Sequence, residues 1–491
     1  MFESVKLKTS NRVEYKNAEN IENFRSSGPV TADIFMSIIA LFIGVAFVYV
    51  ADQDLSSIVF AVFFAMFGMS TVVLLKGNKY EFRAFILSYS ICVLILGFSL
   101  NYSLAYFDML MSTIDSNKFI NIIADSNRTL EELRYVVDAT LPALIWKYLA
   151  DFRSMLNIGD GGPAVYVLLN STLIGFTSVF ITKIANELFV GDEKRIKLAG
   201  TIFSLCGMGW LFGSLLIRDS YALLLNTLGV WVIVKVLVTP NVKNLILALI
   251  VCSLSASFMW YVREKAFYLF FMFAFMAIGL WYLKSKFSPA KVILLLFMMI
   301  VAILAFDQIS SHTSMATDAT SEESEKYTAG SSSQARSDSL GASLVVNQPL
   351  PVRLIVGSAY VLIFPIPIWG YFQLGLPEYF IIKGLHGVFM ILMMPLVIYS
   401  SIKLFKRGPR KDQLSTARFF VFFYFLVTVM LVGVTTLETR HHGQFLSAFI
   451  ILAAMPTVQT QLERGLLKKI RISWFGLIAF GHVIWFLLRF R

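Results

Sequence analysis

Charged residues are scarce in this sequence. Only 15% of its 491 residues are Asp, Glu, Lys or Arg, whereas 57% are hydrophobic. An ordinary water-soluble domain carries nearer a quarter of charged residues. The composition therefore argues against a soluble domain and predicts an integral membrane protein, because this much apolar surface needs lipid as its solvent.

Cysteine and histidine are also few. Cys92, Cys206 and Cys252 each lie inside an apolar run, where they are not placed to form an extracellular disulfide or a CxxC metal site. No HExxH motif or Cys/His spacing typical of metal sites accompanies the five histidines. We therefore expect no cofactor and no metal.

The sequence lacks a recognisable cleavable signal peptide. Its first 32 residues are polar and of mixed charge, without a short apolar core followed by small residues. We expect residues 1–32 to form a cytoplasmic N-terminal segment and the first membrane helix to direct insertion. Apolar runs recur along nearly the whole remainder, so residues 33–491 are predicted to be a single membrane domain.

Long apolar runs are what the sequence has in abundance. Roughly 20 apolar residues make one membrane crossing as a helix. The sequence thus predicts an all-α fold, a polytopic transmembrane helix bundle of 13 spans plus one irregular segment, or of 14 spans. The predicted runs are 33–51, 56–76, 83–105, 162–183, 197–216, 220–238, 244–261, 266–284, 289–306, 352–371, 380–404, 415–436, 443–460 and 473–489.

The basic residues indicate the orientation of these spans. The net charge of +11 comes from Lys and Arg gathered in short loops between apolar runs, as the positive-inside rule requires, and not from a nucleic-acid surface. A full crossing at 352–371 would place the basic loop 403–411 outside. Since Pro365 and Pro367 remove two helix donors there, we expect this segment to be re-entrant or interfacial; a kinked ordinary span is the alternative.

Two outer segments are then long. Residues 106–161 mix charged with apolar residues, which predicts amphipathic helices at the membrane surface. Residues 307–350 are rich in Ser, Thr, Ala and Glu and form a long outer loop in this interpretation. That loop is either a lid over a site or a linker.

Ionisable residues gather at the outer ends of the predicted helices. Charges at the membrane boundary are costly and usually face a cavity or a partner; the alternative is that they are solvated helix ends. Arg218 and Asp219 join two apolar spans with almost no loop. Arg suits bidentate phosphate contacts and Asp could orient it or a substrate hydroxyl, unless the pair is a salt bridge that closes the hairpin.

Two further outer turns carry similar residues. Arg263 and Lys265, in VREKAF, place net positive charge where the positive-inside rule disfavours it, which suggests an anionic ligand; snorkelling side chains are the alternative. Glu438, Arg440 and His441, in ETRHH, supply a carboxylate, a fixed cation and an imidazole. Few purely structural turns need all three types, and a plain polar turn is the alternative.

Three other residues complete the predicted site. Asp138 precedes an amphipathic stretch and could act as a general base toward a hydroxyl, or merely cap a helix. Trp146 follows in the same stretch and could stack on a sugar ring. Arg353 opens the irregular segment and is a further candidate for binding the substrate.

In this order along the chain, these features resemble bacterial multi-spanning glycosyltransferases of the GT-C-like kind and polysaccharide polymerases of the O-antigen (Wzy) type. The resemblance rests on the acidic segment with Asp138, GDGGPAVYVLLNSTLIGF, LLIRDSYALLL, FPIPIW and ETRHH. Arg218, separated by ten residues from Gly229, also resembles a pattern of some polymerases. Arg440 is followed by His441 where many sugar transferases have Tyr.

The resemblance implies transfer of a glycan from an undecaprenyl-diphosphate carrier to a carrier-linked acceptor in surface polysaccharide synthesis, on the outer side of the bacterial cytoplasmic membrane. It implies as partners a polyprenyl-linked glycan, membrane lipid and other polysaccharide assembly proteins. The expected catalytic residues are Asp138, Asp219, Glu438 and His441, and the expected substrate-binding residues are Arg218, Arg263, Lys265, Arg353, Arg440 and Trp146.

Three alternatives remain open. One is a transferase that adds a single sugar from a polyprenyl-monophosphate donor, and another is a flippase or transporter of lipid-linked glycans. A transporter should have related halves and broken helices or charges at mid-membrane, whereas the predicted spans here are almost free of ionisable residues. A structural or sensory membrane protein is the third alternative.

Overall fold

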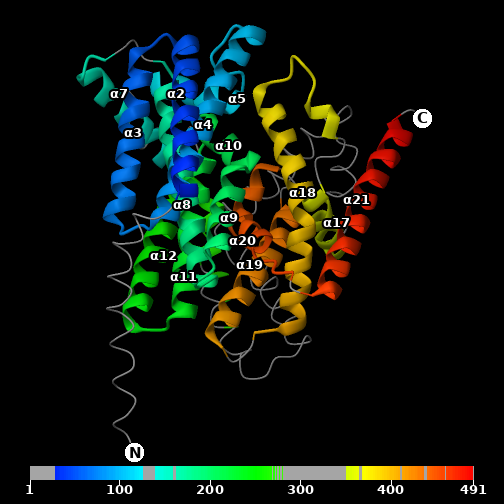
Figure 1. The fold of residues 1–491 in the computed structure, drawn as a ribbon. Coiled ribbons are helices and arrows are strands. Elements are labelled where there is room, and N and C mark those ends of the chain that lie inside the picture. The colour runs from blue at the N-terminus through cyan, green and yellow to red at the C-terminus, as the bar shows by residue number, and fades with distance from the viewer. Residues whose placement is uncertain are drawn as a thin grey trace, which may run out of the picture.

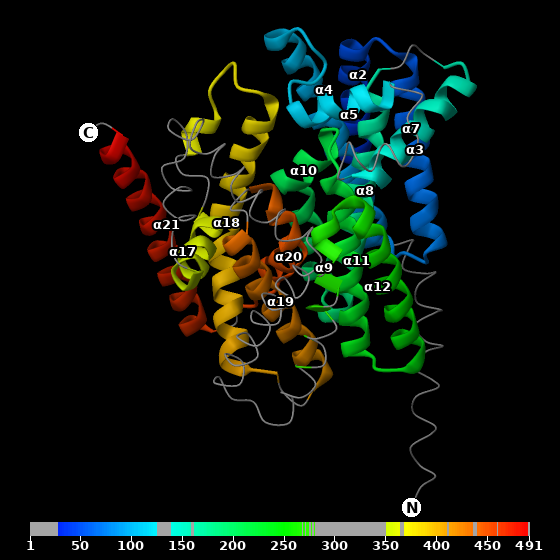
Figure 2. The ribbon, with the colours of Figure 1, turned by 180° about the vertical axis from the view of Figure 1, so that it is seen from behind.

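The computed structural model describes residues 28–124, 139–158, 162–267, 269–270, 272–273, 276, 279, 350–363, 368–409, 412–435, 439–458 and 460–489. All regular secondary structure in these ranges is helical, which confirms the predicted all-α class. The long helices stand side by side in an upright bundle (Figures 1 and 2). The protein is an integral multi-pass membrane protein.

Nine helices within the described ranges are long and apolar enough to cross a membrane. The outer ones expose large apolar side chains such as Phe42 and Phe480, as lipid-facing helices do. The nine are α2 (Gly28–Asp52), α3 (Leu55–Leu74), α4 (Lys79–Phe107), α8 (Ala164–Leu188), α11 (Asp219–Val238), α12 (Val242–Val262), α18 (Glu378–Arg407), α19 (Gln413–Thr435) and α21 (Gln461–Arg489).

The predicted span 197–216 is a bent pair and not one straight helix. Helices α9 (Glu193–Ser204) and α10 (Gly207–Ser214) meet at an angle of 53°. At the bend, Trp210 Nε1 donates to the Ser204 carbonyl at 2.7 Å, and at the far end of α10, Ser171 Oγ donates to the Gly213 carbonyl at 2.6 Å. The number of spans rises to ten if this pair counts as one.

The prediction of a full span at 443–460 is wrong. The helix there, α20 (Leu446–Ala454), has only nine residues and follows the 3₁₀ segment η4 (Thr439–Gln444). Pro456 helps to explain the early end, because proline has no backbone N–H with which to continue the hydrogen bonds of the helix. The predicted runs 266–284 and 289–306 and the loop 307–350 lie largely outside the described residues.

Segment 352–371 contains two described pieces, and its re-entrant or interfacial course stays a prediction because residues 364–367 between them lie outside the described residues. Helix α17 (Leu350–Ile363) has 14 residues and packs along α19, and the 3₁₀ segment η3 (Ile368–Tyr371) comes later in the chain. A Cβ atom on Gly357 would lie only 2.1 Å from the Gly433 carbonyl oxygen, so the two helices touch through their backbones. Pro365 and Pro367 lie outside the described residues.

One end of the bundle, called here the basic end, is closed by ion pairs between helix termini. One set brings together the starts of α2, α4 and α9 and the end of α8, and a separate pair joins the end of α18 to the start of α21. The pairs are Arg83–Asp33 at 2.8 Å, Lys197–Asp33 at 2.7 Å, Lys183–Glu81 at 2.7 Å and Lys403–Glu463 at 2.6 Å. Several loops that the sequence assigned to one side of the membrane therefore share one end of the molecule.

The opposite end carries the short helices α5 (Ile114–Ala124) and α7 (Thr140–Met155), both within the segment predicted to hold amphipathic surface helices (Figure 1). Helix α5 buries Ser116, Phe119 and Ile122 and leaves Asp115 half exposed. Buried residues that recur every third position, as these do, give a short helix one buried face.

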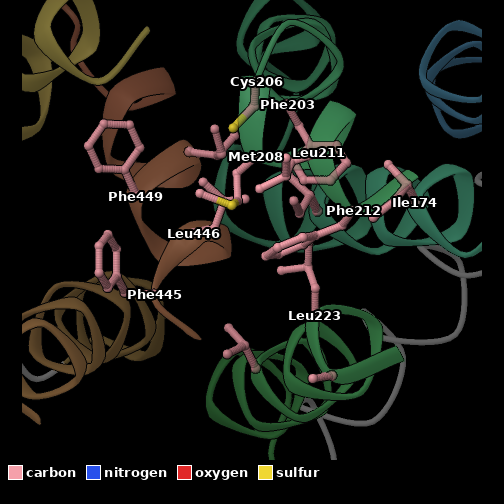
Figure 3. Packing of buried hydrophobic residues seen from close by; sticks show 14 of the residues in the cluster. Ile174, Phe203, Cys206, Met208, Leu211, Phe212, Leu223, Phe445, Leu446 and Phe449 are labelled. Carbon is pink, nitrogen blue, oxygen red and sulfur yellow. The ribbon is translucent and has the colours of Figure 1, made fainter. Parts of the chain in front are cut away.

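Between the two ends lies an apolar core in which α10, α11 and α20 meet. Figure 3 shows Met208 and Phe212 of α10 between Leu446 of α20 and Leu223 of α11. All four side chains are buried. This packing fixes the junction of α10 with α11 next to η4, and these two segments carry much of the candidate site.

Candidate functional site

Three helix ends meet to form the candidate site. Arg218 and Asp219 lie where α10 gives way to α11, Arg263 is the residue at which α12 ends, and Arg440 and His441 lie in η4. Helix α11 packs against both α12 and η4, which brings the three together. We call these five residues, together with Asp115 of α5, the arginine site.

Arg263 lies at the centre of this arrangement. Its Nη1 atom is 3.4 Å from Asp219 Oδ1 and 3.1 Å from His441 Nδ1. A guanidinium can only donate, so His441 Nδ1 accepts and its ring proton lies on Nε2. The Asp219 side chain is only 5% exposed, so Arg263 neutralises a buried carboxylate.

Arg440 binds a second carboxylate, on the more open side of the site. Its Nη1 atom is 2.8 Å from Asp115 Oδ2, and the Asp115 side chain is 50% exposed. Asp115 was not among the predicted site residues, because nothing in the sequence distinguishes it from the other acids of the outer segment. The ion pair fastens the start of α5 to η4.

The pKa of His441 is set by burial and by the positive charges around the ring. Burial lowers the pKa of His441 well below its ordinary value of 6.5, and the positive charges of Arg263, Arg440 and Arg218 and the neighbouring His442 lower it further. The imidazole is therefore neutral. All three arginines act on this one ring.

A second polar row lies behind His441. His442 Nδ1 is 3.1 Å from His386 Nε2, and His386 Nδ1 is 3.7 Å from Cys206 Sγ. Burial, His386 and Lys383 lower the pKa of His442. The sequence analysis missed His386 and Lys383, although an ionisable residue inside an apolar run such as 380–404 is a signal of function.

The polar groups of the site are not arranged as a metal centre. Among the residues that the structure describes, no group of three or more His, Cys, Asp and Glu side chains could hold a metal ion. His386 already uses both of its ring nitrogens in contacts with Cys206 and His442. The chemistry of the arginine site is that of cations, carboxylates and neutral imidazoles.

The structure does not support the predicted role of Trp146 as a surface for a sugar ring. Its side chain is fully buried, with its ring centroid 5.0 Å from that of Phe119 and 5.9 Å from that of Tyr221, both in edge contact. Helix α7 turns Tyr148 outward and Trp146 inward. Trp146 thus packs against Tyr221 and supports the first turn of α11, two residues from Asp219.

Four predicted site residues cannot be placed in this way. Asp138 and Glu438 lie outside the described residues. Lys265 and Arg353 belong to η2 (Glu264–Phe267) and α17, but their side chains lie outside the described part of the structure. Their roles stay predictions.

No protein-family model and no curated protein matches the sequence. The chain is therefore assigned to no family.

Proposed function

We propose that the protein is a glycosyltransferase of the polysaccharide polymerase type. It would transfer a glycan from an undecaprenyl-diphosphate carrier to a sugar hydroxyl on a second carrier-linked unit. The observation that carries this proposal is the grouping of Arg218, Arg263 and Arg440 around the neutral His441, away from the basic end. Several guanidinium groups close together suit the oxygens of a diphosphate.

The positive-inside rule supports the location of this chemistry. If the basic end faces the cytoplasm, the arginine site opens toward the other side of a bacterial cytoplasmic membrane. Carrier-linked sugars are used on that side, without a nucleotide donor. The isoprenoid tail of the carrier would lie between helices, and its diphosphate would reach the arginines at their ends.

The proposed reaction exchanges one bond for another at the anomeric carbon of the donor sugar. The bond from this carbon to the diphosphate oxygen breaks, and the diphosphate leaves with the electron pair. The acceptor hydroxyl oxygen forms the new glycosidic bond and gives its proton to a base. The arginines stabilise the charge that develops on the leaving diphosphate.

Arg263 links binding of the donor to activation of the base. At rest, its Nη1 atom contacts both His441 and Asp219. A diphosphate oxygen that takes this donor leaves His441 Nδ1 and Asp219 as acceptors for a proton, and its negative charge raises the pKa of His441. Either residue can then serve as the base; Asp138 and Glu438 are further candidates, and Lys265 and Arg353 further cations.

The experiment that tests this proposal is deletion of the gene, followed by gel analysis of surface polysaccharide. A polymerase deletion should leave lipid capped with a single unit. Purified protein in proteoliposomes should turn lipid-linked units into longer glycans and release undecaprenyl diphosphate. Polysaccharide of wild-type length after deletion would refute the proposal, and addition of one sugar from a monophosphate donor would identify the related single-sugar transferase.

A second candidate, a flippase for lipid-linked glycans, is favoured by two specific observations. The bent pair of α9 and α10 is a broken helix, and α18 carries the buried Lys383 and His386 within a span. Broken helices and intramembrane ionisable groups are typical of transporters. The expectation that the spans are almost free of ionisable groups therefore does not hold for α18. A flippase would move labelled carrier across proteoliposomes without forming a glycosidic bond.

A further inference from the structure

A buried polar chain crosses the core behind the arginine site. Cys206, at the bend between α9 and α10, contacts His386 of α18, which contacts His442 of η4. All three side chains have no exposed surface. The distances are 3.7 Å from Cys206 Sγ to His386 Nδ1 and 3.1 Å from His386 Nε2 to His442 Nδ1.

The two ends of this row of side chains, Cys206 and His442, belong to the two segments that carry Arg218 and Arg440. Cys206 directly precedes α10. Asn170 Nδ2 donates to the carbonyls of Leu215 and Ile217, both at 2.9 Å, and these bonds hold the backbone that joins α10 to Arg218. At the other end, His442 follows Arg440 and His441 directly. A single imidazole thus touches both segments.

The backbone is shaped to allow this contact. A Cβ atom on Gly207 would lie 2.6 Å from the His386 backbone nitrogen, so only glycine lets α10 approach α18 this closely. Segment η4 has six residues in 3₁₀ conformation, whose hydrogen bonds have poorer geometry than those of an α-helix. Its position therefore depends on contacts made by its side chains.

We propose that His386 is a positioning residue of the arginine site. By its hydrogen bond to His442 it fixes η4 against the bend of α9 and α10, and so sets where Arg440 and His441 lie relative to Arg218 and Arg263. The effect of His386 on catalysis rests on the proposed function. Its role in holding η4 in place is independent of that function.

Two substitutions of similar polarity distinguish the contact of His386 with His442 from its contact with Cys206. In His386→Gln the side-chain amide reaches the place of Nε2 and keeps the bond to His442. In His386→Asn the amide reaches only the place of Nδ1 and keeps the contact with Cys206. Both variants remove the ring, so any loss of ring packing is common to the pair.

The full-length variants are purified in detergent, and two quantities are measured. Binding of inorganic pyrophosphate is measured by calorimetry, and hydrogen exchange is followed in the peptide that covers η4. We expect His386→Asn to weaken pyrophosphate binding by about tenfold and to speed exchange in η4, because it leaves a buried partner without its hydrogen bond. His386→Gln should restore both toward wild type.

Each outcome decides the proposal. Unchanged exchange in η4 in the Asn variant overturns it. Equal losses in both variants also overturn it, because His386 would then act only through the volume of its ring. If the wild-type protein does not bind pyrophosphate, the proposed diphosphate chemistry fails, while the exchange pattern of the two variants still decides whether His386 positions η4.

Discussion

At the scale of single residues, the three arginines differ in what their removal would do to the fold. Arg440 pairs with the half-exposed Asp115, whereas Arg263 pairs with the buried Asp219. Replacing Arg440 should therefore disturb the fold less than replacing Arg263. Arg440 is the cleaner probe of function.

Replacing Arg440 by Ala should lower pyrophosphate binding and turnover at least tenfold, because a charge-assisted contact to phosphate contributes about 1.5 to 3 kcal/mol. Lys at this position should rescue only part of the loss, since it lacks the planar fork. Arg195→Ala is the matched control: that side chain is similarly exposed and also ion-paired, but at the basic end. If Arg440→Ala binds pyrophosphate as tightly as wild type does, Arg440 does not contribute to the proposed binding site.

Replacing Arg263 by Ala should destabilise the protein, because it leaves the carboxylate of Asp219 buried without its cation. Breaking a buried pair in this way costs about 3 to 5 kcal/mol. Thermal unfolding in detergent measures the loss, and the double variant with Asp219→Asn should recover much of it. If the single and double variants melt together at the wild-type temperature, the Arg263–Asp219 pair does not stabilise the fold.

The neutral His441 predicts how stability depends on pH. Burial and the surrounding Arg263, Arg440 and Arg218 lower its pKa in the folded state, and the unfolded chain gains its proton near pH 6.5. Above that pH neither state is protonated there, so His441 contributes no slope. Below it the unfolded state binds more protons, and stability falls by about 1.4 kcal/mol per pH unit for each such group.

Substituting His441 by Asn should therefore flatten the fall in melting temperature between pH 6.5 and pH 5. His442 contributes in the same direction, so part of the slope should remain. His482→Asn, in α21, is the control for removal of a histidine elsewhere. A slope that His441→Asn leaves unchanged would show that this ring is not held neutral.

At the scale of elements, the contact of α17 with α19 depends on two glycines. Gly357→Ala would drive a methyl group against the carbonyl oxygen of Gly433, at 2.1 Å, where backbone cannot yield easily. Overpacking of this kind typically costs about 1 to 3 kcal/mol, so the melting temperature should fall. Gly465→Ala in α21 meets open space and should stabilise its helix by about 0.5 to 1 kcal/mol. Similar effects of both substitutions would contradict the close packing.

At the scale of the whole molecule, the testable property is sidedness. A cysteine at the exposed Asn241, between α11 and α12, should react with an impermeant maleimide only after the inner face is opened, whereas one at the exposed Met109 should react in intact cells. One at residue 330, which lies outside the described residues, should behave like Met109. Cys252→Ser provides the background, because Cys92 and Cys206 are buried. The reverse pattern would invert the topology and remove the proposed site from the outer side.

Much of the membrane fold follows from the sequence alone. Nine predicted apolar runs correspond to the nine candidate spans within the described residues, since a long run without charges has no stable place except in lipid. The bend at Cys206 and the short α20 could not be predicted in this way. Hydropathy shows that a segment is apolar but not whether its helix axis runs straight. Whether a helix bends or ends depends on which side chains satisfy its free backbone groups.

For the site, the sequence identified the helix ends that carry Arg218, Arg263 and Arg440, because charges between apolar runs stand out. The tertiary structure decided the pairing of each cation: Asp219 with Arg263 and Asp115 with Arg440. It also turned Trp146 inward and brought His386 to His442. These contacts join residues distant in sequence, and sequence periodicity specifies which face of a helix is apolar but not which partner that face meets.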